Sequence, residues 1–462
     1  MKKLLFLALF LCSTTWVSAS HLRCGYISAV RSGCGNRTVL ITVTVFTNTA
    51  SEVKFGEDGV LDFGDGKSMV IPRVENISRP DLGPNIGMAI YTINHTYGSV
   101  GSFLISYVEP NRNGGVLNMQ DSFFTTFYTE TKIDLTTCIS SPVFLAPPIF
   151  RGLTNSDFAI SLGATSPNDN LVTYEMGIPF RDRGLTVNGY VQPPNMSINK
   201  LTGSLRWLAE GIQQGEYNFA VIAFQWTKEG DLYKKIGFTR IDFQVILEDK
   251  GLENPPSLSD DQEFEQYSRV LVNPGEEKEI EISYETGNNS TALLEVFSEL
   301  DEGSFSFSTN DVGGPTGDVK TGILTIIPQE SDVRENGYLI TVRGRTTGSG
   351  SNPSSVYDIS YLIYTDEIAE IPTVGGPITA TEKDIAQVEI FPNPVQSQVN
   401  IQVNKPGTSE VRIYTTQGTL IKARSFESNT ILMLSELPSG VYICDVRRNN
   451  AAVRRMKLIK TE

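Results

Sequence analysis

Hydrophobic and polar residues alternate in short runs along most of this chain. Val39, Ile41, Val43 and Val45 alternate with Thr and Leu near the N-terminal end, and residues 399–403 show the same pattern near the C-terminal end. An alternation with a period of two gives a strand one apolar face, which packs against a core. Turn-forming residues separate these runs. The pattern therefore predicts an all-β fold of short strands packed as sandwiches.

Repeated turn and strand signals divide the chain into consecutive domains. A Thr202-Gly203 turn is followed by a strand that begins at 215–217, and Thr321-Gly322 is followed by a similar strand at 337–342. Cadherin-like and bacterial immunoglobulin-like domains show similar signals, and their recurrence about one domain apart indicates repeated sandwiches. We therefore expect three tandem immunoglobulin-like β-sandwiches and a small terminal one. The expected segments are 1–19 (signal peptide), 20–141, 142–250 and 256–368 (sandwiches), 369–384 (linker) and 385–462 (terminal domain).

Three short motifs stand near the C-terminal end. They are Phe391-Pro392-Asn393-Pro394, Leu437-Pro438-Ser439-Gly440-Val441-Tyr442 and Lys457-Leu458-Ile459-Lys460. In this order, they resemble the type A C-terminal sorting domain of the type IX secretion system of Bacteroidota. The alternative is an ordinary terminal β-sandwich. The resemblance implies that the sorting signal comprises Phe391, Pro392, Asn393, Pro394, Leu437, Ser439, Gly440, Val441, Tyr442, Lys457 and Leu458.

The same resemblance implies partners and a location. In that family, the sorting domain carries cargo across the outer membrane through a translocon, a sortase-like protease usually removes it, and the cargo is attached to surface lipopolysaccharide. The Gly- and Pro-containing residues 371–381 offer a natural place for cleavage. The translocon, its protease and lipopolysaccharide are therefore the implied partners, and the protein is expected at the outer cell surface, reached through the periplasm.

The N-terminal residues predict export as well. Lys2 and Lys3 precede an apolar run at 4–11, and Val17-Ser18-Ala19 offers small residues for cleavage. These features are typical of a secretory signal peptide, so the mature chain is expected to start at Ser20. No later stretch is apolar for about 18 residues, so no transmembrane helix is expected.

Charge is unevenly distributed along the chain. The net charge is −15, and residues 251–370 contain 23 acidic and 6 basic residues, whereas residues 385–462 are basic overall. A predominantly acidic body argues against nucleic acid as a partner. The basic terminal domain could meet acidic translocon or lipopolysaccharide surfaces, and a solvated strand face is an equal explanation.

A second resemblance concerns the first sandwich. The stretch Leu61-Asp62-Phe63-Gly64-Asp65-Gly66 is followed by His95-Thr96-Tyr97-Gly98, and the Asp-Gly pair suits a tight turn. The two stretches resemble the polycystic-kidney-disease (PKD) type of immunoglobulin-like domain, with Leu61 where that family has an aromatic residue. The stretches 107–118 and 127–131 look like parts of the N-terminal half of large gliding-motility-associated surface proteins of the same bacteria, and this similarity extends from residue 20 to about residue 248.

Few residues suggest catalysis or a cofactor. Because the two histidines are His21 and His95, neither a Ser-His-Asp nor a Cys-His arrangement is supported. Acidic residues are plentiful, but the row of sandwiches leaves no room for a typical catalytic barrel. Calcium is the more plausible chemistry, since oxygen ligands on turns suit that ion. Its candidate ligands are Asp62 and Asp65 in the first sandwich and Asn168, Asp169 and Asn170 in the second. The alternative is that these side chains cap their own turns.

The cysteines predict a disulfide. Cys24, Cys34, Cys138 and Cys444 remain after removal of the signal peptide, and an exported protein can keep disulfides. We favour Cys24 with Cys34, since they flank an apparent hairpin. Cys34 with Cys138 is the main alternative, and free buried thiols are a third.

These features favour a non-enzymatic surface protein that acts as an adhesin, a stalk or a binding module for a glycan or protein. An exported hydrolase with the same sorting domain, acting on glycosides or peptides, is the alternative. A structural component of a gliding or secretion apparatus is the third hypothesis.

Overall fold

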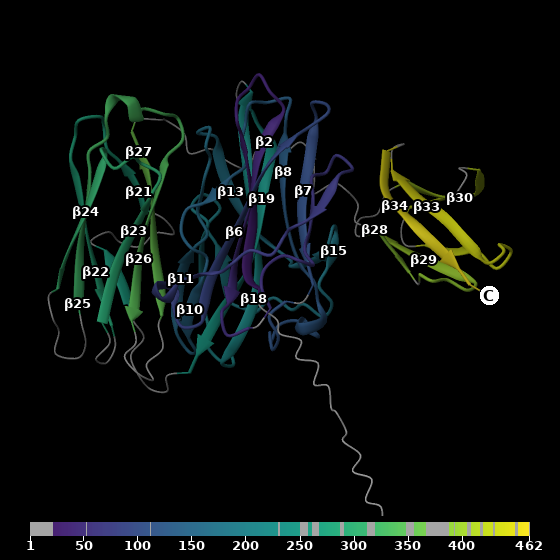
Figure 1. Cartoon of the computed structure of the whole chain (residues 1–462), viewed down its shortest axis with the longest axis horizontal. Coiled ribbons are helices and arrows are strands. Elements are labelled where there is room, and N and C mark those ends of the chain that lie inside the picture. The colour runs from purple at the N-terminus through teal and green to yellow at the C-terminus, as the bar shows by residue number, and fades with distance from the viewer. Residues whose placement is uncertain are drawn as a thin grey trace, which may run out of the picture. The chain divides into compact units, whose positions relative to one another are not determined.

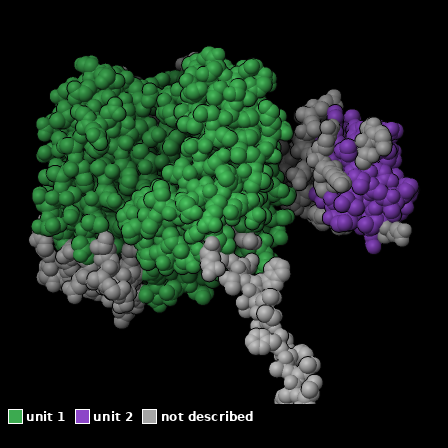
Figure 2. All heavy atoms as spheres, viewed as in Figure 1, with its two compact units in different colours: residues 1–368 green, residues 369–462 purple. Residues whose placement is uncertain are grey.

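The chain forms two compact units, residues 1–368 and 369–462 (Figure 2). The computed structural model describes residues 22–51, 53–110, 112–229, 232–249, 257–260, 268–286, 291–311, 319–347, 355–365, 388–391, 393–403, 408–415, 419–427, 430–448 and 451–461. Their regular structure is 34 strands and three short 3-10 helices, which confirms the all-β expectation. No helix in these ranges is long and apolar enough to cross a membrane. The expected signal peptide and linker lie outside the described residues.

The first unit is built on a 12-stranded sheet (Figure 1). Nine of its strands follow the order β4-β3-β7-β8-β19-β1-β2-β6-β5, and β10, β13 and β18 branch from this path around β19. The strands are β1 (Leu22–Arg31), β2 (Thr38–Asn48), β3 (Val60–Asp62), β4 (Ser68–Val70), β5 (Ile77–Ser78), β6 (Ile86–Thr96), β7 (Ser102–Glu109), β8 (Phe127–Asp134), β10 (Phe150–Leu153), β13 (Leu171–Gly177), β18 (Gly215–Glu229) and β19 (Leu232–Glu248).

Alternation along β2 places one side of the strand in the core. Val39, Ile41, Val43 and Val45 are all fully buried and pack with residues of β1, β3, β7 and β8. Burial of each such side chain contributes about 1.5–3 kcal/mol relative to exposure. The sequence pattern therefore identified this strand and its buried face correctly.

Strand β19 joins segments that the sequence assigns to separate sandwiches. It pairs with β1 and β8, from the expected segment 20–141, and with β10 and β18, from the expected segment 142–250. The sheet is therefore continuous across the expected boundary at residues 141 and 142. The two segments share hydrogen-bonded strands and do not form separate sheets.

Short strands and loops complete this part of the unit. The aromatic side chain of Trp207 is almost fully buried and contacts Phe158, Tyr217 and Phe219, which ties the short strands to β18. The remaining elements are β9 (Val143–Phe144), β11 (Asp157–Ser161), β12 (Ala164–Thr165), β14 (Phe180–Asp182), β15 (Leu185–Thr186), β16 (Met196–Ile198), β17 (Ser204–Leu208), η1 (Pro80–Leu82) and η2 (Ser122–Phe124).

Residues 257–364 form a sandwich of two four-stranded sheets, coloured green in Figure 1. The sheet orders are β20-β22-β25-β24 and β21-β27-β26-β23, and apolar residues from both sheets meet in one core. The elements are β20 (Ser257–Asp260), β21 (Ser268–Leu271), β22 (Lys278–Glu285), β23 (Thr291–Ser298), β24 (Phe305–Asp311), β25 (Val319–Ile326), η3 (Glu330–Asp332), β26 (Tyr338–Thr347) and β27 (Val356–Tyr364).

A buried ion pair joins this sandwich to the rest of the first unit. Arg343 of β26 donates two hydrogen bonds to Asp358 of β27, at 2.8 and 2.9 Å, and a third to the Pro147 carbonyl at 2.8 Å. The Ser161 amide of β11 donates to the same Asp358 carboxylate at 2.7 Å. Both charged side chains are 0% exposed. The contact between the two parts is therefore dry and fully hydrogen-bonded at this point.

The second unit is a small sandwich of two sheets. Their orders are β28-β29-β32 and β31-β30-β33-β34. Alternating residues such as Val399 and Ile401 on one sheet and Val411 and Ile413 on the other are fully buried between them. The strands are β28 (Val388–Phe391), β29 (Gln398–Val403), β30 (Ser409–Thr415), β31 (Leu420–Phe426), β32 (Thr430–Met433), β33 (Gly440–Arg448) and β34 (Ala451–Lys460).

The disulfide joins Cys34 to Cys138, so the favoured pairing of Cys24 with Cys34 is wrong. Cys24 is a fully buried thiol near the start of β1, whereas Cys34 lies in the exposed turn after β1. A strand rises about 3.3 Å per residue, so the length of β1 keeps these cysteines too far apart to be bridged. The Cα atoms of Cys34 and Cys138 are 4.9 Å apart.

Candidate functional site

The first and last of the three C-terminal motifs meet at one edge of the second unit. The Asn393 side-chain oxygen accepts a hydrogen bond from the Ile459 amide at 2.8 Å. The Val395 amide donates to the Ile459 carbonyl, and the Thr461 amide donates to the Val395 carbonyl, both at 2.8 Å. We call Asn393, Val395, Ile459 and Thr461 the terminal clasp. It holds the segment before β29 against the end of β34.

The last three residues of the middle motif, Gly440 to Tyr442, lie on β33 beside the clasp. Val441 is paired with Ile459 and Tyr442 with Leu458 in the antiparallel register of β33 and β34. Leu458 is fully buried, and the Tyr442 ring packs in the same core while its hydroxyl donates to the Pro438 carbonyl at 2.8 Å. Three motifs that are far apart in the sequence therefore occupy one region of this unit.

For the remaining residues of the expected sorting signal, the structure gives fewer contacts. Pro394 and Ser439 are exposed, Leu437 is half-buried against the core, and Gly440 pairs with Lys460. Phe391 and Lys457 lie on β28 and β34, where the structure describes their backbone, and Pro392 lies outside the described residues.

Sequence reasoning missed Val395. This side chain is fully buried, and its backbone takes part in three hydrogen bonds of the clasp, one with Ile459 and two with Thr461. The only available signal was its place directly after the Pro-Asn-Pro turn. One apolar residue outside an alternating run gives no periodicity, so the pattern could not identify it.

Replacing Asn393 with Ala should loosen the clasp. The Ile459 amide loses its acceptor, which costs about 1 kcal/mol, a large share of the stability of so small a unit. We expect less protein at the cell surface, measured by protease accessibility on whole cells. Asn393→Asp keeps an acceptor oxygen and should retain most of the export. Gln396→Ala, at an exposed neighbour, is the matched control, and equal export by Asn393→Ala and Gln396→Ala would contradict this role.

In the first unit, the structure brings together the two segments that carry the second resemblance. The His95 ring stacks on Phe63, with 4.0 Å between ring centroids, and its Nε2 lies 2.9 Å from an Asp65 oxygen. The Tyr97 hydroxyl donates to the Phe63 carbonyl at 2.9 Å. His95 therefore packs a turn against β6.

The candidate calcium ligands of the first sandwich have protein partners. Asp62 accepts a hydrogen bond from the Gly64 amide at 2.7 Å, and Asp65 accepts one from the Lys67 amide at 3.1 Å. Gly64 has a φ of 79° and lies against the Leu104 backbone, so the turn needs glycine there. These carboxylates cap their own turn, as the alternative interpretation states.

The candidate ligands of the second sandwich also contact protein groups. The Asp169 carboxylate accepts a hydrogen bond from Arg334 at 2.7 Å, and the Asn168 side chain accepts one from the Ser140 amide at 2.7 Å. Among the described residues, no group of three or more His, Cys, Asp or Glu side chains could hold a metal ion. The geometry therefore adds no support to a calcium site.

The Asp65 carboxylate should make stability depend on pH. Burial, the largest single effect, raises its pKa, but the hydrogen bonds from His95 and Lys67 together hold the pKa below its ordinary value. A lowered folded-state pKa stabilises the fold above about pH 4, and this contribution is lost as the pH falls through the folded value. We expect Asp65→Asn to lose about 1 kcal/mol at pH 7 in urea unfolding, and progressively less as the pH falls below about 4 and through the folded-state pKa of Asp65. A loss of stability in Asp65→Asn that does not change with pH would refute the lowered pKa of Asp65.

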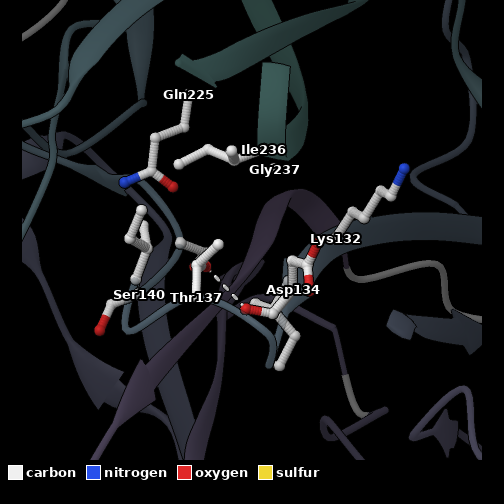
Figure 3. A pocket seen from close by; sticks show the side chains of 10 residues that line it. Lys132, Asp134, Thr137, Ser140, Gln225, Ile236 and Gly237 are labelled. Atoms are coloured by element: carbon white, nitrogen blue, oxygen red, sulfur yellow. Dashed lines mark hydrogen bonds between the residues drawn. The ribbon is translucent and has the colours of Figure 1, made fainter. Parts of the chain in front are cut away.

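A shallow pocket is lined in part by residues that flank a cysteine of the disulfide in the sequence (Figure 3). Its residues include Thr137 and Ile139, which flank Cys138, and the Thr137 hydroxyl donates to the Asp134 carbonyl at 2.8 Å. The space there that a water-sized molecule could occupy is about 0 Å³, whereas ligand pockets usually enclose roughly 300–1,000 Å³. The pocket is therefore too small to bind a typical small molecule.

Comparison with known proteins places one part of the chain in a family. Residues 389–461 match the family described as secretion system C-terminal sorting domain. No curated protein matches the chain. A solved structure, the crystal structure of Dpr2 Ig1-Ig2 in complex with DIP-Theta Ig1-Ig3, is 13% identical and is aligned over 72% of this chain and 95% of that chain. Its TM-score of 0.17 is too low to support an argument about the fold or function of this protein.

Proposed function

We propose that this protein, which its sorting domain directs to the cell surface or the extracellular space, is a non-enzymatic cargo of the type IX secretion system that acts there as a stalk or binding module. The observation that carries the proposal is the convergence of the three terminal motifs within residues 389–461, around the terminal clasp. In this proposal, a translocon recognises the second unit, a sortase-like protease cuts within 369–384, and surface lipopolysaccharide becomes the anchor.

The first unit supports the role of a stalk or binding module. Its sandwiches share sheet strands or are joined by the buried pair Arg343 and Asp358, so force applied at one end passes through hydrogen-bonded contacts. The side chain of His95 is engaged in packing a turn rather than activating a nucleophile. Loops at the ends of the strands would provide the contacts to a glycan or protein, as in other sandwiches.

The intact mass of the surface-bound form tests the proposal. We expect a chain from Ser20 to a residue within the linker 369–384, with a heterogeneous glycolipid mass added. A surface chain that still ends at Glu462 and carries no added mass would refute cleavage and anchoring. As a control for activity, the purified surface form should leave glycoside and peptide substrates unchanged, and turnover of either class would refute the non-enzymatic role.

A further inference from the structure

Strand β6 has an open outer edge. On that side, β5 pairs only with Met88 and Gly87. From Ala89 to Thr96, no strand in the described part of the chain pairs with this edge, although the pairing with β2 on the other side is continuous. About eight residues of strand are therefore available to a partner.

The direction of the backbone groups on β6 follows from its neighbours. The Tyr97 amide donates to the Arg37 carbonyl on the β2 side, at 3.1 Å, whereas the Ile86 carbonyl accepts from the Arg79 amide on the outer side, at 2.9 Å. Bonding direction alternates from one residue to the next along a strand. Even-numbered residues therefore direct their amide and carbonyl groups outward, and in the open part these are Ile90, Thr92, Asn94 and Thr96.

Side-chain burial supports an unoccupied edge. Tyr91 and Ile93 point to the core like Val43 and Ile41, their partners on β2, yet they are only half-buried while the β2 residues are fully buried. No strand among the described residues lies beyond β6 to cover them. A strand added there would complete their burial.

The open part of β6 carries none of the residues or bulges that usually protect an edge strand against pairing. Proteins shield edge strands with lysines, prolines, bulges or covering segments. The open part of β6 has no Lys, Arg or Pro, and its register with β2 has no bulge. Strand β32 of the second unit, in contrast, has its Met433 and Ile431 carbonyls capped by Lys422 and Arg424, both at 2.8 Å.

We propose that β6 pairs with β6 of a second copy of this chain, in antiparallel orientation about a two-fold axis at Ile93. This register places Thr92 opposite Asn94 and Ile90 opposite Thr96, and it uses every outward amide. The outward residues carry no charge, so the same surface can face itself without like-charge repulsion.

A second copy fits this edge better than an unrelated peptide. Recognition of a foreign strand usually relies on pockets beside the edge that read its side chains. The pocket at residues 132–141 and 225–237 and the shallow cleft at 152–158 and 355–357 contain no residue of β6. Ile90, which is 42% exposed, and Ile77, which is 56% exposed, would instead be covered by a close symmetric partner.

Sedimentation equilibrium of the full mature chain tests the pairing. We expect a dimer for the native sequence and a monomer for Thr92→Lys, whose exposed side chain would set a charge into the symmetric interface. Ser308→Lys, on the exposed face of edge strand β24, is the matched control and should remain dimeric. An unchanged far-ultraviolet circular dichroism spectrum of Thr92→Lys would show that folding is intact. A monomeric native chain at 100 µM, or a Thr92→Lys dimer, would overturn the proposal.

Cysteine cross-linking tests the register separately. A mixture of Thr92→Cys and Asn94→Cys chains should form a disulfide-linked dimer, because these residues face each other across the proposed axis. Either variant alone should cross-link at least tenfold less. Efficient cross-linking of Thr92→Cys alone, or none in the mixture, would overturn the proposed arrangement.

Discussion

Replacing Arg343 with Ala should lower the free energy of unfolding of the first unit by about 3–5 kcal/mol. The substitution leaves the carboxylate of Asp358 without its two hydrogen bonds from the guanidinium, at a site where neither side chain is exposed. It also removes the donor to the Pro147 carbonyl. An uncompensated buried charge costs more than the pair contributes, so the loss should far exceed that of a surface ion pair. Urea unfolding followed by tryptophan fluorescence measures it.

Two further variants separate this effect from a general loss of packing. The double variant Arg343→Leu with Asp358→Leu removes both charges and should be less destabilised than Arg343→Ala alone. Arg206→Ala breaks a largely exposed pair with Asp157 and should cost at most about 1 kcal/mol. If Arg343→Ala and Arg206→Ala lose similar amounts of stability, the buried pair does not join the sandwiches.

Replacing Cys138 with Ser should destabilise the first unit by about 3–5 kcal/mol. The disulfide to Cys34 closes a loop with a sequence separation of 104 residues, and a long closed loop restricts the unfolded chain strongly. Arg31 links the two segments that the disulfide joins. Its guanidinium donates to the Leu135 carbonyl at 3.2 Å and to the Asn36 carbonyl at 2.5 Å. Thermal unfolding under oxidising conditions measures the loss.

The controls for this prediction rely on the fact that the disulfide needs both cysteines. The double variant Cys34→Ser with Cys138→Ser should be no less stable than Cys138→Ser, because one bond is lost in each case. A reducing agent should bring the native chain to the same level and leave both variants unchanged. If the double variant loses twice as much stability as Cys138→Ser, the destabilisation comes from the two side chains rather than from the disulfide bond.

Structural features that depend on neighbouring residues could be predicted from local sequence patterns. The alternation at 39–45 predicted a strand with one buried face, and the turn residues around Asp62 and Asp65 predicted the caps that the structure shows. The three terminal motifs predicted the sorting domain before their spatial convergence was known. In each case, the signal lies within a few residues of the feature.

Contacts between distant segments could not be predicted in the same way. Nothing near residues 232–248 indicates that β19 would lie between β1 and β8, and the spacing of Cys24 and Cys34 suggested a hairpin bond that the length of β1 prevents. Asp169 seemed a turn residue or a calcium ligand, whereas its carboxylate pairs with Arg334 more than a hundred residues later. Strand order and register decide such contacts, and the periodicity of a single strand does not encode them.

The position of β19 also sets the order in which this protein can complete its fold during export. Strands β1 and β8 precede β19 in the chain, so the strand that pairs with both is the last of the main sheet to be delivered when the chain is exported from its N-terminus. Until residue 248 has followed, these strands have unpaired edges, which invite pairing with other chains. The N-terminal half is therefore most prone to pair with the wrong chain in the interval before β19 arrives.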